Sequence, residues 1–234
     1  MVEIIPAVMA DSLEDLREKL SRVDGLVPLV QLDVMDGKFV PSQGWPYVEG
    51  GPQEFTRIIS EEEGFPFWNS LDFEVDLMVE NPETVLENWI SAGVRRIIVH
   101  EESTTELEKI IQNITARFRS AEALESGGVE LGVALGVDTG NEVILPFLNK
   151  IDFVQFMGIL RIGFQGEPFD ERVIEKIVDL RELKPDVIIA VDGGVNLETA
   201  PVLIEAGVNR LAVGSALFES DDIEATLKKF QALG

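Results

Sequence analysis

The stretch Gln31-Leu-Asp-Val-Met-Asp-Gly37 places an acidic residue at the end of an apolar, strand-like run. The same arrangement occurs in Glu74-Val-Asp-Leu-Met-Val79 and in Val191-Asp-Gly-Gly-Val195. In a barrel of parallel strands, the carboxyl ends of the strands converge on one pocket. The three stretches therefore predict that three carboxylates share one pocket, those of Asp33, Asp76 and Asp192. Carboxylates held that close need a cation, a shared proton or a substrate that uses their shifted pKa values.

The composition restricts the classes of function. The chain has 234 residues, 45% of them hydrophobic, and a formal net charge of -24 that should repel nucleic acid and anionic membranes. No apolar run is long enough to span a bilayer, and no basic region precedes an apolar one at the N-terminus, so we expect a cytoplasmic protein. Cysteine is absent, which excludes disulfides, thiolate nucleophiles and thiolate zinc sites.

Apolar strand candidates alternate with amphipathic helices along the whole chain, without a linker or a break in composition. This alternation predicts eight strand–helix units and hence one (β/α)8 TIM barrel over residues 1–234, an α/β fold. A doubly wound open sheet is the alternative, although the chain lacks its dinucleotide fingerprint. The expected strands are Glu3–Met9, Leu29–Met35, Phe73–Val79, Arg96–His100, Leu131–Leu135, Phe153–Met157, Val187–Val191 and Arg210–Val213.

The segment 39–66 after the second strand is longer than a minimal barrel needs. It contains Trp45, Tyr47 and five glycines or prolines between Gly44 and Pro52, which indicates a long loop over the catalytic face followed by a short helix. Loops of this length are often functional. The segment either contacts substrate or a partner subunit, or is an ordinary surface excursion. Assembly into a homo-oligomer stays open.

Glycine-bearing loops in the last third of the chain indicate a phosphate site. Barrels commonly bind phosphate with the loops after the last two strands, because glycines let backbone N–H groups approach an anion. A third such loop follows the sixth strand, and Arg161 there could pair with phosphate through its forked donors. The predicted phosphate-binding residues are Gly163, Gly166, Gly193, Gly194, Gly214, Ser215 and Arg161.

Together these motifs resemble the ribulose-phosphate 3-epimerase family over nearly the whole chain. Leu32-Asp-Val-Met-Asp-Gly-Lys-Phe-Val-Pro41 resembles the family's second-strand signature, and Asp76-Leu-Met-Val-Glu-Asn-Pro82 resembles its third. The flap, the seventh strand and the eighth strand have counterparts in Gly163-Phe-Gln-Gly166, Val191-Asp-Gly-Gly-Val195 and Val213-Gly-Ser-Ala-Leu-Phe218. The resemblance implies the ribulose-phosphate-binding type of TIM barrel and a phosphorylated sugar as substrate.

The resemblance also implies a mechanism and a set of site residues. Two aspartates in that family flank C3 of a ketopentose 5-phosphate, and Asp33 and Asp192 occupy their positions here. One removes the proton and the other returns it to the opposite face, through an enediolate held by a divalent metal. Abstraction beside a carbonyl suits a carboxylate of raised pKa. The family's cluster of methionines that line the pocket corresponds to Met35, Met78 and Met157.

The family's metal site pairs its two aspartates with two histidines, and here Gln31 and Asp76 stand at those positions. The resulting metal ligands would be Asp33, Asp76, Asp192 and Gln31, an oxygen-donor set that suits Mg or Mn better than Zn or Fe. The absence of any metal is the equal alternative. The only histidine, His100, ends the fourth strand and is interpreted as a hydrogen-bonded wall residue rather than an acid or base.

Three functions remain open from the sequence. The first is a sugar-phosphate isomerase that resembles ribulose-5-phosphate 3-epimerase and uses Asp33 and Asp192. The second is a sugar-phosphate-binding barrel without epimerase turnover, which the missing histidines would favour. The third is an epimerase-like enzyme with a changed substrate. A Schiff-base aldolase is not favoured, because no lysine lies within a predicted strand core.

Overall fold

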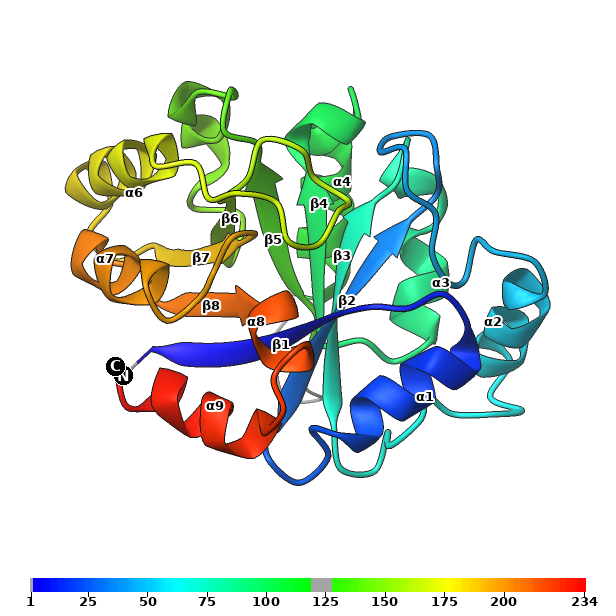
Figure 1. Cartoon of the computed structure of the whole chain (residues 1–234). Coiled ribbons are helices and arrows are strands. Elements are labelled where there is room, and N and C mark those ends of the chain that lie inside the picture. The colour runs from blue at the N-terminus through cyan, green and yellow to red at the C-terminus, as the bar shows by residue number, and fades with distance from the viewer. Residues whose placement is uncertain (1, 119–127) are drawn as a thin grey trace.

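Eight parallel strands close into one barrel in the order β1 to β8, each paired with its neighbours in sequence and β1 with β8. The computed structural model describes residues 2–118 and 128–234 (Figure 1). The closed sheet confirms the predicted TIM barrel and excludes the open, doubly wound alternative. The strands are β1 (Glu3–Met9), β2 (Leu29–Met35), β3 (Asp72–Met78), β4 (Arg96–His100), β5 (Glu130–Leu135), β6 (Phe153–Met157), β7 (Ile188–Asp192) and β8 (Arg210–Val213).

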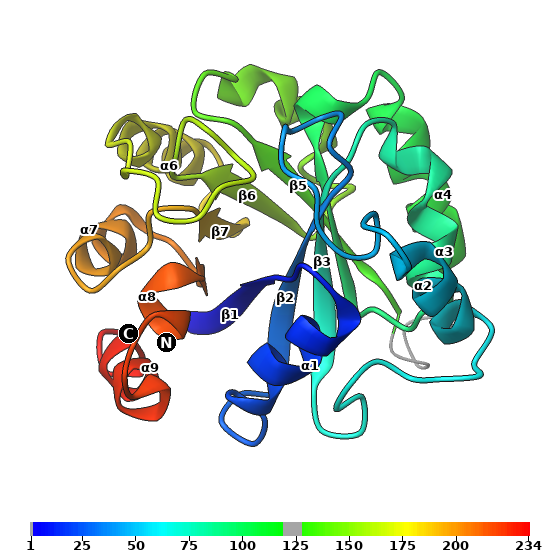
Figure 2. The same cartoon turned by 45° about the vertical axis from the view of Figure 1, so that its right-hand side comes forward.

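Helices surround the barrel on its outer side (Figure 2). Among the described residues the α-helices are α1 (Leu13–Ser21), α2 (Gly51–Ile59), α3 (Leu86–Ser91), α4 (Leu107–Phe118), α6 (Arg172–Leu183), α7 (Thr199–Ala206), α8 (Ser215–Phe218) and α9 (Ile223–Gln231). The expectation of an α-helix in every unit is wrong for the connection between β5 and β6. Two short 3-10 helices, Asn141–Val143 and Leu145–Phe147, take its place there. Pro146 cannot donate a backbone hydrogen bond, which disfavours a longer helix.

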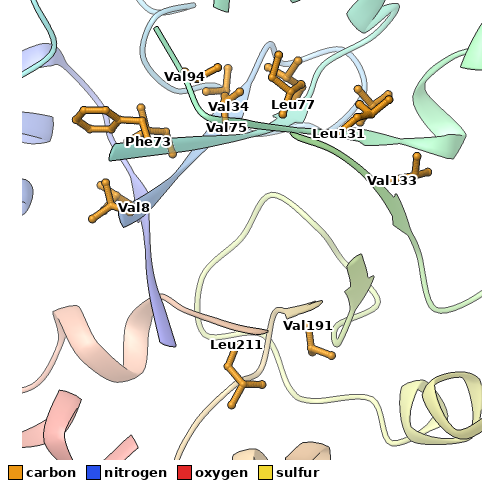
Figure 3. Close-up of a cluster of buried hydrophobic side chains, with 14 of the residues drawn as sticks. Val8, Val34, Phe73, Val75, Leu77, Val94, Leu131, Val133, Val191 and Leu211 are labelled. Atoms are coloured by element: carbon orange, nitrogen blue, oxygen red, sulfur yellow. The ribbon is translucent and has the colours of Figure 1, made fainter. Parts of the chain in front are cut away.

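The hydrophobic core has two layers because each strand turns alternate side chains inward and outward. The outward layer packs against the helices and includes Val34, Leu77 and Leu211, which point away from the barrel centre in Figure 3. The inward layer is smaller, and Phe153 fills its middle. A Cβ atom on Gly132 would lie only 2.4 Å from the Phe153 ring, so the glycine makes room for this ring inside the barrel.

Ion pairs fill the end of the barrel at the N-termini of the strands. Arg96 pairs with Glu3, Glu74 and Glu130, and its side chain is 12% exposed. Arg210 pairs with Glu3 and Glu130, and its guanidinium group lies 4.7 Å from the centre of the Phe153 ring. This layer of charged groups closes the barrel at the N-terminal ends of the strands. The opposite end, where the strands finish, stays open.

The segment 39–66 divides between the mouth of the barrel and its outer side. Trp45 is buried against Phe55 and Trp89, outside the barrel, and donates a hydrogen bond to Glu54. Only the start of the segment reaches the mouth, where the Phe39 ring lies 5.3 Å from that of His100. The loop over the catalytic face is therefore shorter than predicted, because the middle of the segment packs into the hydrophobic core.

The chain ends lie side by side at the base of the barrel (Figure 1). A Cβ atom on Gly234 would lie 2.8 Å from the backbone nitrogen of Val2. Within residues 2–118 and 128–234, no helix is long and apolar enough to cross a membrane.

Candidate active site

The strand register brings the acidic residues to the open end of the barrel. Asp33 on β2 pairs directly with Asp76 on β3, and Asp192 ends β7 opposite Met157 of β6. One carboxylate oxygen from each of the three aspartates lies within 4.8 Å of the other two. The structure therefore places these three residues together, as the strand ends indicated.

Gln31 joins two of the three carboxylates. Its side-chain nitrogen Nε2 donates to Oδ1 of Asp33 at 2.8 Å and to Oδ2 of Asp192 at 2.7 Å. The glutamine is fully buried, and its oxygen Oε1 has no hydrogen-bond partner among the residues that the structure describes. Each N–H of the amide thus holds one carboxylate, which fixes the distance between Asp33 and Asp192.

Asp76 has its own partners and lies behind the pocket wall. Its Oδ1 is 2.8 Å from Nε2 of His100, and its Oδ2 accepts a hydrogen bond from Nε2 of Gln155 at 2.9 Å. The side chains of Asp76 and His100 are fully buried. His100 is therefore hydrogen-bonded, as interpreted from its position at a strand end, but it lies with Asp76 behind the pocket wall rather than in it.

Burial and mutual repulsion raise the pKa values of the paired aspartates. Burial, followed by the charges of Asp192 and Asp76, holds the pKa of Asp33 well above its ordinary value. Burial and the charge of Asp76 raise the pKa of Asp192 to about 7, against the lowering effect of the Gln31 amide. Burial lowers the pKa of His100, but the Asp76 carboxylate outweighs it and leaves that pKa raised. The aspartate pair can therefore hold a proton near neutral pH, and the Asp76 carboxylate favours the protonated form of His100.

A pocket opens over these aspartates. The empty space inside it, open solvent at its mouth included, is about 510 Å³. Ten of the predicted site residues line this pocket: Asp33, Met78, Met157, Gly163, Gly166, Asp192, Gly193, Gly194, Gly214 and Ser215. Met35 does not line it, but packs beside Met78 and Val40 at the rim.

The loops after β6, β7 and β8 meet at one side of the pocket. Gly193 and Gly194 have φ values of +92° and +70°, which side chains rarely adopt. A Cβ atom on Gly194 would lie 2.9 Å from Phe169, so the loop after β6 packs tightly on this turn. Glycine backbone at a pocket wall leaves room for an anion beside backbone N–H groups.

Gln165 is a pocket residue that the sequence reasoning did not select. Its Nε2 lies 3.5 Å from the position that a Cβ atom on Gly214 would occupy, so the amide stands over the loop after β8. The glutamine lines the pocket between Gly163 and Gly166. The sequence did contain a signal for Gln165, because this side chain lies between two glycines that were predicted to bind phosphate. A hydrogen-bond donor at that position can contact the same anion.

Arg161 lies at the outer side of the same loop rather than in the pocket wall. Its side chain is 63% exposed, pairs with Glu167 at 3.3 Å and lies over the Phe164 ring. Glu167 does line the pocket. Arg161 therefore offsets an acidic side chain near the predicted phosphate position.

The grouping of Asp33, Asp76 and Asp192 could hold a metal ion by distance alone. The hydrogen bonds of Gln31 argue against a metal site there. The group between Asp33 and Asp192 is an N–H donor, which cannot be a metal ligand. As arranged, these side chains do not fit a metal ion held between Asp33 and Asp192.

Comparisons with known proteins identify the family and the fold. A model described as the ribulose-phosphate 3 epimerase family matches residues 3–218. The ribulose-phosphate 3-epimerase of Bacillus subtilis (strain 168) is 30% identical over 99% of both chains. That of Aquifex aeolicus (strain VF5) is 28% identical over 98% of this chain and 96% of its own. A crystal structure of KGPDC from Streptococcus mutans has a TM-score of 0.67 at 13% identity, covers 100% of this chain and 97% of its own, and shows the shared fold.

Proposed function

Because the chain belongs to the ribulose-phosphate 3-epimerase family, we propose that it interconverts ribulose 5-phosphate and its C3 epimer, xylulose 5-phosphate. The class of the enzyme, a carbohydrate-phosphate epimerase, follows from family membership. The proposal adds the substrate, ribulose 5-phosphate, and the two residues that move the proton, Asp33 and Asp192.

The observation that carries the proposal is the pair of buried carboxylates at the floor of one pocket. Epimerisation removes the proton from C3, beside the carbonyl at C2, and returns a proton to the opposite face. The C–H electron pair moves into the C2–C3 bond, and negative charge builds on the carbonyl oxygen. One aspartate must be ionised to accept the proton, and the other must carry the proton that is returned. A pair whose pKa values are raised toward neutrality can hold both forms.

The rest of the pocket suits a phosphorylated sugar. The glycine turns and Gln165 offer uncharged donors to a phosphate on the side of the loops after β6, β7 and β8. Met78 and Met157 offer apolar surface beside the reacting carbons without hydrogen-bonding to them. A hard cation, Mg or Mn, was one expectation for this site, but the mechanism proposed here contains no metal-dependent step.

Turnover of ribulose 5-phosphate in deuterated water tests the proposal. The wild-type protein should form xylulose 5-phosphate that carries deuterium at C3. Asp33→Asn and Asp192→Asn should each lower kcat by about 10³-fold or more, because one of the two proton carriers is lost. Either variant can still exchange the C3 proton of one epimer with solvent, since one base suffices for that half reaction.

Three results would contradict the proposal. Full activity in either variant would remove the two-base mechanism. Phosphate-dependent binding of the sugar without product or deuterium incorporation would instead support the sugar-phosphate-binding barrel. Activity on a different phosphorylated ketose would indicate the changed substrate.

A further inference from the structure

Gln31 places an amide group between the two aspartates that are proposed to move the proton. We propose that Gln31 is a positioning residue that replaces a bridging cation, so that this site holds and orients its carboxylates without a metal ion. The inference rests on the proposed function for the roles of Asp33 and Asp192. Its central claim, that the site does not take up metal, can be measured without any turnover.

The geometry shows why one amide can do this. Nε2 lies 2.8 Å from an oxygen of Asp33 and 2.7 Å from an oxygen of Asp192, so each of its two hydrogens serves one carboxylate. Hydrogen bonds to ionised groups are stronger than neutral ones. Two such bonds outweigh the cost of leaving Oε1 without a partner in the protein interior.

The reverse orientation of the amide would remove both bonds. Oε1 would then face one oxygen of Asp33 and one of Asp192 at the same 2.7–2.8 Å. The one proton that the pair carries could join Oε1 to one aspartate, but Oε1 and the ionised aspartate would repel each other unless a cation lay between them. The orientation of the Gln31 amide and the binding of a cation are therefore alternatives to each other.

The remaining acid does not restore a metal site. Asp76 is held by His100 on one oxygen and by Gln155 on the other, and it does not line the pocket. Nε2 of His100 lies 2.8 Å from Oδ1 of this carboxylate. The site thus holds its third carboxylate with side chains, just as it joins the other two with one.

Gln155 provides a matched control. Like Gln31, it is a buried glutamine on a barrel strand, and its Nε2 donates to an aspartate. It contacts only Asp76 among the three aspartates, and so its loss does not separate Asp33 from Asp192. Gln31→Met and Gln155→Met each remove one buried amide at similar side-chain volume.

Metal binding is measured first. Purified wild-type protein is stripped with EDTA and titrated with Mg²⁺, Mn²⁺ and Zn²⁺, and the thermal midpoint is recorded with each. We expect no stoichiometric binding to the wild-type protein. Its thermal midpoint should shift by less than about 1 °C with each metal, because only a ligand that binds the folded state raises the midpoint. Gln31→Glu keeps the shape but replaces the donor with a carboxylate, so Mn²⁺ should raise its midpoint by several degrees. One metal bound per wild-type chain, lost in Asp33→Asn or Asp192→Asn, would overturn the inference.

Kinetics then test the positioning role. EDTA should leave wild-type kcat unchanged. Gln31→Met should lower kcat at least about tenfold with KM within about threefold, because the phosphate end of the pocket is untouched. Gln155→Met should leave kcat within about threefold.

Chelator-sensitive wild-type turnover, or equal kcat in Gln31→Met and wild type, would count against the role. If Gln31→Met does not fold, Gln31→Glu with and without Mn²⁺ gives the same comparison. If ribulose 5-phosphate is not turned over at all, the proposed function fails while the metal titration still decides this inference.

Discussion

At the residue scale, the raised pKa of Asp192 makes the activity sensitive to pH. In the proposed mechanism one aspartate of the pair is ionised and the other protonated, and the pKa of Asp192 is raised to about 7 by burial and by the charge of Asp76. As pH rises above that value, the pair loses the proton that must be returned to C3. We expect kcat/KM to fall about tenfold per pH unit from pH 8 to 9. A pH profile for wild type checks this, and a flat profile between pH 6 and 9 would contradict it.

Gln165 carries a second prediction at this scale. Its amide stands over Gly214 in the pocket, where it can donate to a substrate phosphate. Gln165→Ala should raise KM for ribulose 5-phosphate about five- to tenfold, the loss of about one hydrogen bond to a charged group, with kcat nearly unchanged. Inorganic phosphate should weaken as a competitive inhibitor by the same factor. An unchanged inhibition constant for phosphate would place the amide away from the anion.

Some residues of the candidate active site could be predicted from the sequence, and others could not. Asp33 and Asp192 could be predicted because acids at strand ends point into a barrel mouth. The hydrogen bonds of Gln31 could not, since the same glutamine could have turned its oxygen or its nitrogen toward the carboxylates. The pairing of His100 with Asp76 joins adjacent strands, and it depends on the exact length of each strand. Arg161 was expected at the phosphate because its charge suits an anion, and the structure pairs it with Glu167.

At the scale of elements, β3 and β4 are joined by the buried pair of Asp76 and His100. Removing the histidine leaves a buried carboxylate without its counter-charge. His100→Gln should lower the free energy of unfolding by about 3 kcal/mol at pH 7, as measured by urea denaturation. His100→Gln combined with Asp76→Asn should recover much of that loss, because no charge is then buried. A single variant within about 0.5 kcal/mol of wild type would show that the pair contributes little.

Strands were more predictable than the connections between them. Runs of Val and Ile set the strand bounds to within one residue, because buried parallel strands need apolar side chains on both faces. The connection after β5 was predicted as a helix from the repeat of the fold, although Gly136, Gly140 and Pro146 disfavour one there. The position of Trp45 depends on packing against Trp89 of α3, which is distant in sequence.

At the scale of the whole molecule, the ion-pair layer at the barrel base links stability to pH. Burial outweighs the effect of Arg96 and raises the pKa of Glu74 from 4.5 to about 7. The folded state therefore holds this proton more tightly than the unfolded chain does. The resulting stabilisation is fully present below about pH 4.5 and is lost as pH rises to about 7, a change of about 3 kcal/mol.

Glu74→Gln tests this linkage. The variant cannot titrate at this position, so its unfolding free energy should decline less than that of wild type between pH 4.5 and 7. Urea denaturation at several pH values measures the difference. Asp33 and Asp192 contribute with the same sign in both proteins and cancel in the comparison. Parallel curves for the two proteins would show that Glu74 is ionised in the fold throughout this range.

Val2 and Gly234 meet at the end of the barrel where β1 and β8 begin. Because β1 pairs with β8 just beside them, the polypeptide nearly forms a ring. A short glycine linker could join Gly234 to Val2, and new ends could be opened between exposed Glu62 and Glu63, after α2. The barrel should tolerate such a circular permutation, since no strand pair would be broken. The order in which the strands leave the ribosome would change while the enzyme stayed the same.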